Sequence, residues 1–269
     1  MNELEAKFGK LTKFVDKFNS ILVAFSGGVD SSTLAAVCHE RGKEVVAVTV
    51  HSPLTPSREL KRAREIAREI GIKHEILRVN PLENEKFVKN DNNRCYYCKK
   101  FMIENLLKYL EEKEFEVIFE GTNASDLKKG RPGYKAIKES RKVFSPWAEC
   151  GFTKEEIRSI AKRMGFTFYN EPSLACLATR IPTNTEIEER ALAMVDMAEN
   201  VVIDLAGVRQ VRVRKLGDIA VIEVGKEEIF KLLDSRIFES IVKELKVLGF
   251  VRVLIDMEGY EEGKGNLTM

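Results

Sequence analysis

The chain has 269 residues, of which 44% are hydrophobic and 32% are charged. Its 44 lysines and arginines nearly balance 42 aspartates and glutamates, and a formal net charge of +2 excludes the strong positive field typical of nucleic-acid-binding proteins. The length is sufficient for one sizeable core and a smaller second domain. Abundant lysine and glutamate, with Gln210 as the single glutamine, indicate a thermophilic source.

Membrane and export signals are not evident in the sequence. The first residues carry no basic region followed by an apolar run, and no stretch approaches 18 uninterrupted apolar residues. We therefore expect a cytoplasmic protein that acts without a membrane. In that reducing compartment, the five cysteines are expected to be thiols, ligands or catalysts rather than structural disulfides.

The first part of the chain alternates predicted helices with predicted strands. Apolar residues at helical spacing predict a helix over the first 19 residues, and the apolar run 21–25 predicts a buried strand. Further strands are expected at residues 43–50, 72–79 and 115–120, and helices at residues 56–70, 93–112 and 153–164. This alternation is typical of an α/β fold, in which helices cover both faces of a parallel sheet and ligands bind at the carboxyl ends of the strands.

The pattern changes near residue 180. Beyond it we expect a helix at 186–205, strands at 208–215 and 219–224, a helix at 227–248 and a strand at 250–255. Gly217 and Asp218 fit a hairpin turn between the first two of these strands. We therefore predict two domains, an α/β nucleotide-binding domain over residues 1–180 and a small α+β domain over residues 181–269.

A glycine-rich turn follows the first strand and leads into a helix. It reads Ser26-Gly27-Gly28-Val29-Asp30-Ser31, with Ser32 next. Glycines permit positive φ angles and close backbone approach, and a helix N-terminus favours an anion, so we expect phosphate there. Neither G-x-x-x-x-G-K-[S/T] nor G-x-G-x-x-G is present, and no lysine lies in the turn. The alternative is an ordinary glycine turn between a strand and a helix.

The turn resembles the PP-loop of ATP pyrophosphatases, S-G-G-x-D-S. The resemblance implies that the turn and its serines bind the pyrophosphate portion of ATP while Asp30 helps to hold Mg²⁺. It further implies that AMP and pyrophosphate are the products, so that a substrate is activated by adenylation. Residues 1–180 would then be a PP-loop ATP pyrophosphatase domain.

Three cysteines lie in motifs that we interpret as functional. Cys95 and Cys98 form a Cys-x-x-Cys pair at the start of a predicted helix, where two thiols are within reach of one metal or of each other. Cys176 lies far along the chain, in the segment 171–182. We favour a [4Fe-4S] cluster held by these three cysteines, with a fourth iron open to bind exogenous sulfide. Free thiols with Cys176 as a reactive sulfur, and a zinc or purely structural site, stay open as alternatives.

The other cysteines and His51 are expected to be structural. Cys38 lies on the apolar face of a predicted helix, so we expect it in the core. Cys150 is interpreted as a packing residue. His51 ends a predicted strand beside the glycine turn, and we interpret it as a hydrogen-bonded polar residue rather than a catalyst.

Five motifs in order together resemble the LarE family. They are SGGVDS at 26–31, RCYYCK at 94–99, GTNASDLKKGRPG at 121–133, SPWAECGFTKEEIR at 145–158 and EPSLACLATRIP at 171–182. The resemblance spans almost the whole chain. It implies an ATP-dependent sulfur transferase of nickel-pincer nucleotide cofactor synthesis, which adenylates the carboxylates of pyridinium-3,5-biscarboxylic acid mononucleotide and converts them to thiocarboxylates. It also suggests a homo-oligomer.

The LarE resemblance implies two possible sources of sulfur. One variant of the family sacrifices the sulfur of a single cysteine, at the position of Cys176, and leaves dehydroalanine. The other has three cysteines and resembles cluster-dependent thiolation enzymes. Because Cys95, Cys98 and Cys176 are all present, the catalytic cluster form is favoured and the sacrificial form is the alternative.

Further site residues are predicted at strand ends. Gly121, Asp126 and Arg131 follow a predicted strand and are candidates for nucleotide or pyrophosphate contacts, the alternative being a capping aspartate and a solvated arginine. Asp30 and Cys176 are the predicted catalytic residues.

A second group is predicted to bind the substrate, and it comprises Arg180, Arg212, Arg214 and Glu223. Arg212 and Arg214 alternate along one strand and so share a face, where paired guanidinium groups suit a phosphate and a carboxylate. Glu223 on the neighbouring strand would orient them, and Arg180 follows Cys176 closely. The alternative is an exposed, charged face of a sheet.

Other functions compete with this interpretation. A PP-loop tRNA thiolation enzyme would use the same three cysteines, but a strongly basic face or an added RNA-binding module would then be expected. An ammonia-using amidating synthetase would not need the cysteines. A non-catalytic nucleotide or iron-sulfur sensor would bind ATP or a cluster without releasing pyrophosphate.

Overall fold

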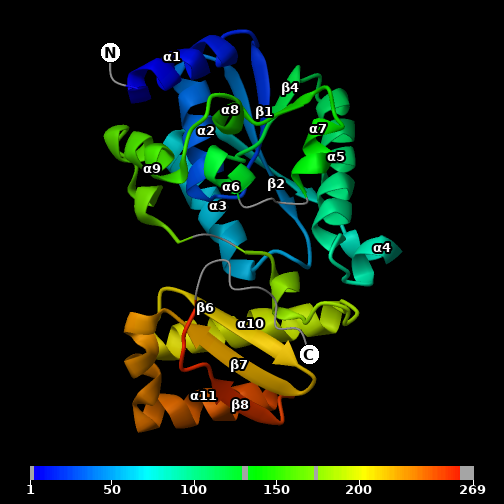
Figure 1. The fold of residues 1–269 in the computed structure, drawn as a ribbon, viewed down its shortest axis with the longest axis vertical. Helices are drawn as coiled ribbons and strands as arrows, with labels where there is room; N and C mark the ends of the chain where they lie inside the picture. The colour runs from blue at the N-terminus through cyan, green and yellow to red at the C-terminus, as the bar shows by residue number, and fades with distance from the viewer. Residues whose placement is uncertain (1–2, 129–132, 173–174, 261–269) are drawn as a thin grey trace. The chain divides into compact units, whose positions relative to one another are not determined.

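A computed structural model of the chain describes residues 3–128, 133–172 and 175–260. They form two compact units, and in Figure 1 most of the first is drawn in blue to green and most of the second in yellow to red. The first unit takes the described residues of Met1–Ser52, Ser57–Asn84 and Asn93–Leu174, and the remainder belongs to the second. Two short segments, Pro53–Pro56 and Glu85–Asn92, thus join the C-terminal part of the chain. The domain boundary between residues 180 and 181 stays a prediction.

The first unit is built on a parallel sheet in the order β3-β2-β1-β4-β5 (Figure 1). Its strands are β1 (Ser20–Ala24), β2 (Glu44–His51), β3 (Lys73–Arg78), β4 (Val117–Phe119) and β5 (Val143–Phe144). All four strand pairs are parallel, which confirms the predicted α/β fold. Strand β5 has only two residues, too few to produce a pattern in the sequence, and was not predicted.

Helices cover both faces of this sheet, as predicted. One face packs against α1 (Glu3–Val15), α2 (Val29–Glu40), α3 (Ser57–Ile70) and α9 (Lys154–Arg163). The other packs against α5 (Arg94–Glu112) and α7 (Tyr134–Lys138). Short helices complete the connections of this unit: η1 (Pro81–Glu83), α6 (Ala124–Lys128), α8 (Pro146–Glu149) and η2 (Thr167–Asn170). The short helices α4 (Glu85–Val88) and η3 (Leu177–Arg180) belong to the second unit. Each helix in the described part of the chain is too short or too polar to span a lipid bilayer.

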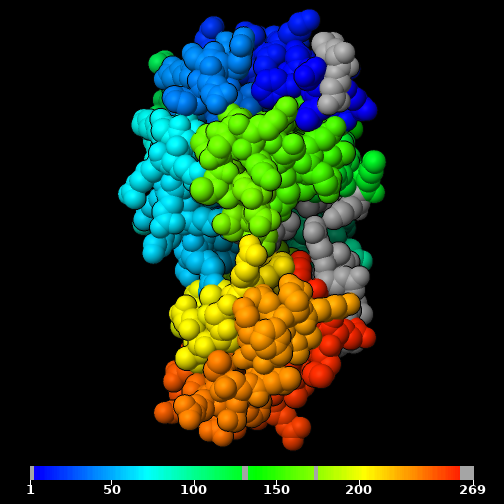
Figure 2. All heavy atoms as spheres, turned by 90° about the vertical axis from the view of Figure 1, so that its left-hand side faces the viewer, coloured from blue at the N-terminus to red at the C-terminus, as the bar shows by residue number. Residues whose placement is uncertain are grey.

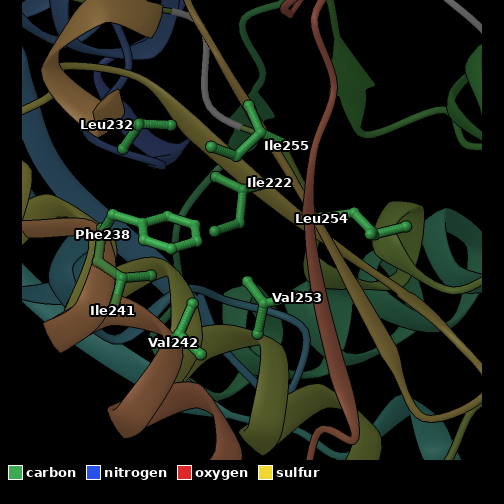
Figure 3. A pocket seen from close by; sticks show the side chains of 8 residues that line it. All are labelled: Ile222, Leu232, Phe238, Ile241, Val242, Val253, Leu254 and Ile255. Atoms are coloured by element: carbon green, nitrogen blue, oxygen red, sulfur yellow. The ribbon is translucent and has the colours of Figure 1, made fainter. Parts of the chain in front are cut away.

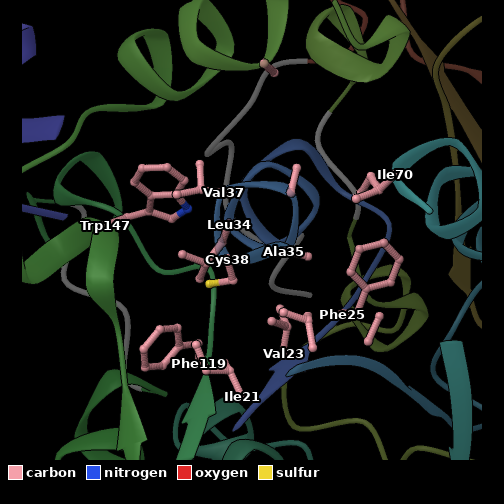
Figure 4. Packing of buried hydrophobic residues seen from close by; sticks show 14 of the residues in the cluster. Ile21, Val23, Phe25, Leu34, Ala35, Val37, Cys38, Ile70, Phe119 and Trp147 are labelled. Carbon is pink, nitrogen blue, oxygen red and sulfur yellow. The ribbon is translucent and has the colours of Figure 1, made fainter. Parts of the chain in front are cut away.

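The first face of the sheet forms the larger core, in which Cys38 is buried. Figure 4 shows the Cys38 side chain on α2 among apolar groups of the sheet and of α2 itself. Its exposed fraction is 0%, and burial raises the pKa of its thiol. The expectation of a core cysteine is confirmed. Cys150 packs partly buried against the same core, as expected of a packing residue.

The second unit is a small α+β fold with a mixed three-stranded sheet. Its elements are α10 (Glu189–Ala206), β6 (Val211–Leu216), β7 (Ile219–Val224), η4 (Lys226–Leu233), α11 (Ser235–Val247) and β8 (Arg252–Ile255). Strand β7 lies in the middle, antiparallel to β6 and parallel to β8. The helices η4 and α11 form an outer face of the unit, drawn in orange in Figure 2.

The single helix predicted at residues 227–248 was wrong, because the chain is interrupted at Asp234. This residue has an extended conformation, and its carboxylate accepts hydrogen bonds from the amides of Arg236 and Ile237, at 3.0 and 3.2 Å. An aspartate in that position caps a new helix and ends the preceding turn. The result is the 3-10 helix η4 followed by α11.

Candidate functional site

The predicted phosphate loop connects β1 to α2, and Gly27 gives it its shape. Gly27 has a φ angle of +72°, and a Cβ atom there would lie 2.9 Å from the Cα atom of Ala63 on α3. Only glycine fits both the left-handed conformation and the close approach. Gly28 has a φ angle of −81° and is the N-cap of α2. Only the first of the two glycines therefore uses positive φ.

The serines of the loop bind one another. The Ser31 hydroxyl accepts a hydrogen bond from the Ser26 amide, lies 3.2 Å from the Ser26 hydroxyl and donates to the Gly28 carbonyl. The Ser26 hydroxyl in turn accepts from the Gly28 amide. The Ser32 hydroxyl is buried and has no partner among the described residues. These bonds fix the loop before any ligand arrives, which reduces the entropy lost on binding.

The loop lies where the order of the strands reverses. Strand β1 pairs with β2 on one side and with β4 on the other, and ligands of such sheets bind at this point. Gly121, which follows β4, touches the loop directly. A Cβ atom on Gly121 would lie 3.0 Å from the Ser31 amide nitrogen and 3.1 Å from the Asp30 Cβ atom. Gly121 thus allows the end of β4 to approach the loop, next to the residue predicted to hold Mg²⁺.

Asp30 is held by three other segments of the first unit. Its carboxylate forms an ion pair with Lys154 of α9 and accepts a hydrogen bond from the Asn123 side-chain amide at 3.2 Å. Its backbone carbonyl accepts from the indole nitrogen of the buried Trp147 at 2.9 Å. Burial raises the pKa of Asp30, and the nearby Lys154 opposes that rise. The sequence did not predict Lys154 or Trp147 for this site.

Asp126 interacts with Asn123 near Asp30. The Asp126 amide donates to the Asn123 side-chain oxygen at 3.1 Å, and the Asn123 amide donates to the Asp126 carboxylate at 3.3 Å. This reciprocal arrangement is the capping role that the sequence left open for Asp126. A role in nucleotide binding stays a prediction, and Arg131 lies outside the described residues.

Cys95 and Cys98 lie in the first turns of α5. Cys95 is exposed, and Cys98 is half-buried with its sulfur 4.0 Å from that of Met102. Cys176 is exposed and belongs to the second unit. No disulfide joins the five cysteines, all of which are described. Residues 3–128, 133–172 and 175–260 contain no assembled group of three or more His, Cys, Asp or Glu side chains suited to a metal.

A buried carboxylate connects the cysteine-bearing helix to the end of β4. Glu120 is only 5% exposed and accepts hydrogen bonds from the Thr122 amide and hydroxyl and from the Ser145 hydroxyl. It also forms an ion pair, at 3.3 Å, with Lys99, which is the residue directly after Cys98. This network fixes the start of α5 relative to the loop, and no local sequence signal indicated it.

In the second unit, Arg180 supports the turn that carries Cys176. Arg180 is 2% exposed, and its Nε and Nη2 atoms donate to the Glu199 carboxylate at 2.7 and 3.3 Å. Its Nη1 atom donates to the Cys176 carbonyl at 3.2 Å and to the Thr179 hydroxyl at 2.6 Å. The Thr179 hydroxyl also donates to the Cys176 carbonyl at 2.8 Å. Arg180 therefore orients the backbone of Cys176.

Arg212 and Arg214 have different surroundings, although they alternate along β6. Arg214 is buried and forms two hydrogen bonds with Glu223, at 2.5 and 3.0 Å, and its remaining Nη1 atom donates to the Thr179 carbonyl. Arg212 is half-buried and lies over the ring of Tyr260, 5.1 Å from its centroid. Glu223 thus holds one of the two arginines. Their roles in substrate binding stay predictions.

His51 and an apolar pocket of the second unit are further features that could contact a ligand. His51 ends β2, and its buried Nδ1 atom has no hydrogen-bond partner among the described residues. The interpretation of His51 as a structural residue rather than a catalyst stays a prediction. The pocket lies in the second unit (Figure 3). Its lining is entirely apolar: Ile222, Leu232, Phe238, Ile241, Val242, Val253, Leu254 and Ile255. A charged nucleotide would find no polar partner in it.

The glycine loop, its place at the reversal of strand order and the half-buried Asp30 together define an enzyme of the PP-loop class that uses ATP. Comparison with known proteins supports the same class. Residues 20–92 match the family described as "Queuosine biosynthesis protein QueC". This region contains β1, the loop and α2.

Relatives extend the similarity to the whole chain. "Uncharacterized protein slr1717" of Synechocystis sp. is 35% identical, with 99% of each chain covered. The "Pyridinium-3,5-bisthiocarboxylic acid mononucleotide synthase" of Lactiplantibacillus plantarum is 29% identical, over 100% of this chain and 97% of its own. The "tRNA-specific 2-thiouridylase MnmA" of Halothermothrix orenii is 26% identical, but over only 56% of this chain and 53% of its own. The chain therefore belongs to the LarE family of PP-loop, ATP-dependent sulfur transferases.

Proposed function

We propose that this enzyme adenylates the carboxylates of pyridinium-3,5-biscarboxylic acid mononucleotide and converts them to thiocarboxylates for nickel-pincer cofactor synthesis. The observation that carries the proposal is the preformed PP-loop, with the half-buried Asp30 paired to Lys154 within it. Full-length similarity to the Lactiplantibacillus plantarum synthase supports this substrate. Similarity to the tRNA enzyme is confined to about half of each chain, which favours the mononucleotide.

The proposed reaction has two steps for each carboxylate. First, a carboxylate oxygen attacks the α-phosphorus of ATP, and the bond to the β-phosphate breaks to release pyrophosphate. A sulfur nucleophile then attacks the acyl carbon, and the bond to AMP breaks. A carboxylate is a poor electrophile, whereas an acyl-adenylate carries a good leaving group, and holding the reactants in one site favours both steps.

The loop and its surroundings would bind and activate ATP. The amides at the N-terminus of α2, together with Ser26, Ser31 and Ser32, would hold the pyrophosphate portion. Asp30 would hold Mg²⁺, because carboxylate oxygens are ligands that this cation prefers. When bound, Mg²⁺ would neutralise charge on the phosphates. Because Gly121 has no side chain, the backbone after β4 can lie close to the loop. Asp126 adds negative charge near Asp30.

Substrate binding is assigned to the second unit. Arg212 would contact the anionic groups of the mononucleotide. Arg180 and Arg214 already donate to Glu199 and Glu223, so we propose that they position Cys176 and the strand that carries Arg212. Glu223 would act by fixing Arg214.

Cys95, Cys98 and Cys176 would hold a [4Fe-4S] cluster. The donor set is suitable, since it supplies three thiols outside any disulfide, of which those of Cys95 and Cys176 are exposed. The described residues contain no preassembled group of metal ligands, so these thiols would become ligands only on loading. When bound through three cysteines, such a cluster supplies an open iron that accepts sulfide. The second candidate is sacrificial transfer of the Cys176 sulfur, which the exposure of Cys176 favours.

The test of the overall reaction is incubation of the enzyme with ATP, Mg²⁺, sulfide and the mononucleotide. We expect AMP and pyrophosphate in equal amounts and, by mass spectrometry, exchange of one oxygen for one sulfur in each carboxylate. The Asp30→Asn variant should release neither AMP nor pyrophosphate and should form no thiocarboxylate. Product formation with total tRNA but not with the mononucleotide would refute the proposal in favour of tRNA thiolation, and ATP binding without pyrophosphate release would favour a sensor.

The source of sulfur is tested by anaerobic reconstitution. We expect about four irons per chain, lost in each of the Cys95→Ala, Cys98→Ala and Cys176→Ala variants. Cys150→Ala is the matched control. Cys150 is half-buried against the main core and is not one of the proposed ligands, so this variant should keep its iron. If the wild-type protein takes up no iron, and Cys176 loses one H₂S on turnover, the sacrificial route is correct instead.

A further inference from the structure

Lys154 is already paired with the carboxylate of Asp30, which in the proposed function binds Mg²⁺. Its ammonium group forms an ion pair with the Asp30 carboxylate across a separation of 124 residues. A cation that binds Asp30 must therefore compete with this ammonium group. We propose that Lys154 is a built-in counter-ion that competes with Mg²⁺ for Asp30 and makes metal binding depend on the nucleotide. The inference rests on the proposed function and adds a positioning residue to it.

The position of Lys154 is fixed by its own helix. Lys154 is the first residue of α9 and lies inside the capping box that Thr153 and Glu156 form. Its amide donates to the Ser125 hydroxyl at 3.2 Å, and Glu156 is further anchored by an ion pair with Lys7 at 2.8 Å. The backbone of Lys154 is therefore held on two sides, and its side chain extends from a fixed point.

The Asp30 carboxylate is also prevented from turning away. Its second oxygen accepts a hydrogen bond from Asn123, and its carbonyl accepts one from the buried Trp147. Asp126 lies close enough for its charge to act on Asp30. A half-buried carboxylate with a second carboxylate nearby is costly without a cation. Because the glycine loop contains no lysine, Lys154 supplies that cation from another part of the unit.

The two cations differ in what they need from the nucleotide. A bare divalent cation at Asp30 would either displace the ammonium group or remain beside it, and like charges a few ångströms apart repel strongly. A cation that arrives bound to the triphosphate is accompanied by the negative charge of the phosphates. That charge compensates the positive charge of Lys154 as well as that of the metal. Lys154 should therefore weaken the binding of metal alone much more than the binding of metal with nucleotide. Its presence creates a positive coupling between the two ligands.

The experiment measures metal binding at equilibrium. Mn²⁺ is titrated into the whole chain and free Mn²⁺ is followed by electron paramagnetic resonance, with and without α,β-methylene-ATP. This analogue cannot be cleaved between the α- and β-phosphates, so no reaction occurs. Neither the mononucleotide nor sulfide is needed. The result is thus independent of whether the proposed substrate is correct.

Lys154→Met is the informative variant, and Lys162→Met is the matched control. Lys162 is exposed on the same helix, eight residues further on, which places it about 12 Å along the helix axis from Lys154. We expect Lys154→Met to bind Mn²⁺ alone about tenfold more tightly than the wild-type protein and to lose about tenfold in the coupling with the nucleotide. Lys162→Met should change neither quantity.

Other outcomes overturn the inference. A lysine that only stabilises the fold would leave Mn²⁺ binding unchanged or weaker in Lys154→Met, with the coupling intact. Thermal unfolding is measured alongside, and Lys154→Gln replaces Lys154→Met if that variant does not fold. Lys154→Arg keeps the charge and should keep the wild-type coupling, so a loss of coupling in this variant would also overturn the inference.

Discussion

The buried pair of Arg180 and Glu199 permits a quantitative prediction. The two residues are 2% and 5% exposed, and Glu199 accepts three hydrogen bonds, two from Arg180 and one from the Val213 amide at 3.1 Å. In Glu199→Gln the volume is conserved, but the guanidinium group of Arg180 stays buried without a counter-charge. Removing one partner of a buried ion pair costs about 3–5 kcal/mol, and the retained amide oxygen places this variant at the lower end, near 3 kcal/mol.

The assay is urea denaturation followed by circular dichroism. Glu189→Gln on the same helix is the control, because Glu189 is exposed and its substitution should change the unfolding free energy by no more than about 0.5 kcal/mol. The double variant Arg180→Met/Glu199→Met removes both charges and should recover most of the loss. It should still impair sulfur transfer, since Arg180 no longer holds the Cys176 carbonyl. A loss below about 1 kcal/mol in Glu199→Gln would refute this reasoning.

Two further predictions concern the loop and the pH dependence of stability. Gly27→Ala should lose nucleotide binding in calorimetry and cost more stability than Gly42→Ala, because both have φ near +70° but only Gly27 has a backbone atom, the Cα of Ala63, within 2.9 Å of the new Cβ. The left-handed conformation alone costs about 1–2 kcal/mol, and equal losses in the two variants would contradict the steric argument. Burial, followed by the charge of Arg64, lowers the pKa of His74 in the folded state, so the unfolded chain binds the proton first as the pH falls. The free energy of unfolding should therefore decrease as the pH drops below about 6.5, and it should decrease less steeply in His74→Gln. If the urea midpoints of the wild-type protein and of His74→Gln fall by the same amount between pH 8, 6 and 5, His74 is excluded as a cause.

Sequence periodicity predicted most of the fold because the interactions that produce it are local. The apolar run 21–25 and the alternation of later elements predicted the parallel sheet, and the helix predicted at residues 153–164 corresponds to α9. The errors occurred where a single residue or a very short element decided the outcome. Asp234 divides a helix that apolar spacing alone would continue, and the two-residue β5 forms only because β4 supplies its hydrogen-bond partners.

The sequence by itself determined the loop at 26–31, because six consecutive residues contain both its glycines and its polar groups. It also determined which cysteines lie in distinctive motifs. Tertiary structure alone decided what surrounds them. Lys154 reaches Asp30, Glu120 joins Lys99, and Arg180 turns towards Glu199 rather than towards solvent. The physical reason is that buried charges must find counter-charges, and the fold, not the spacing along the chain, decides which one lies within reach.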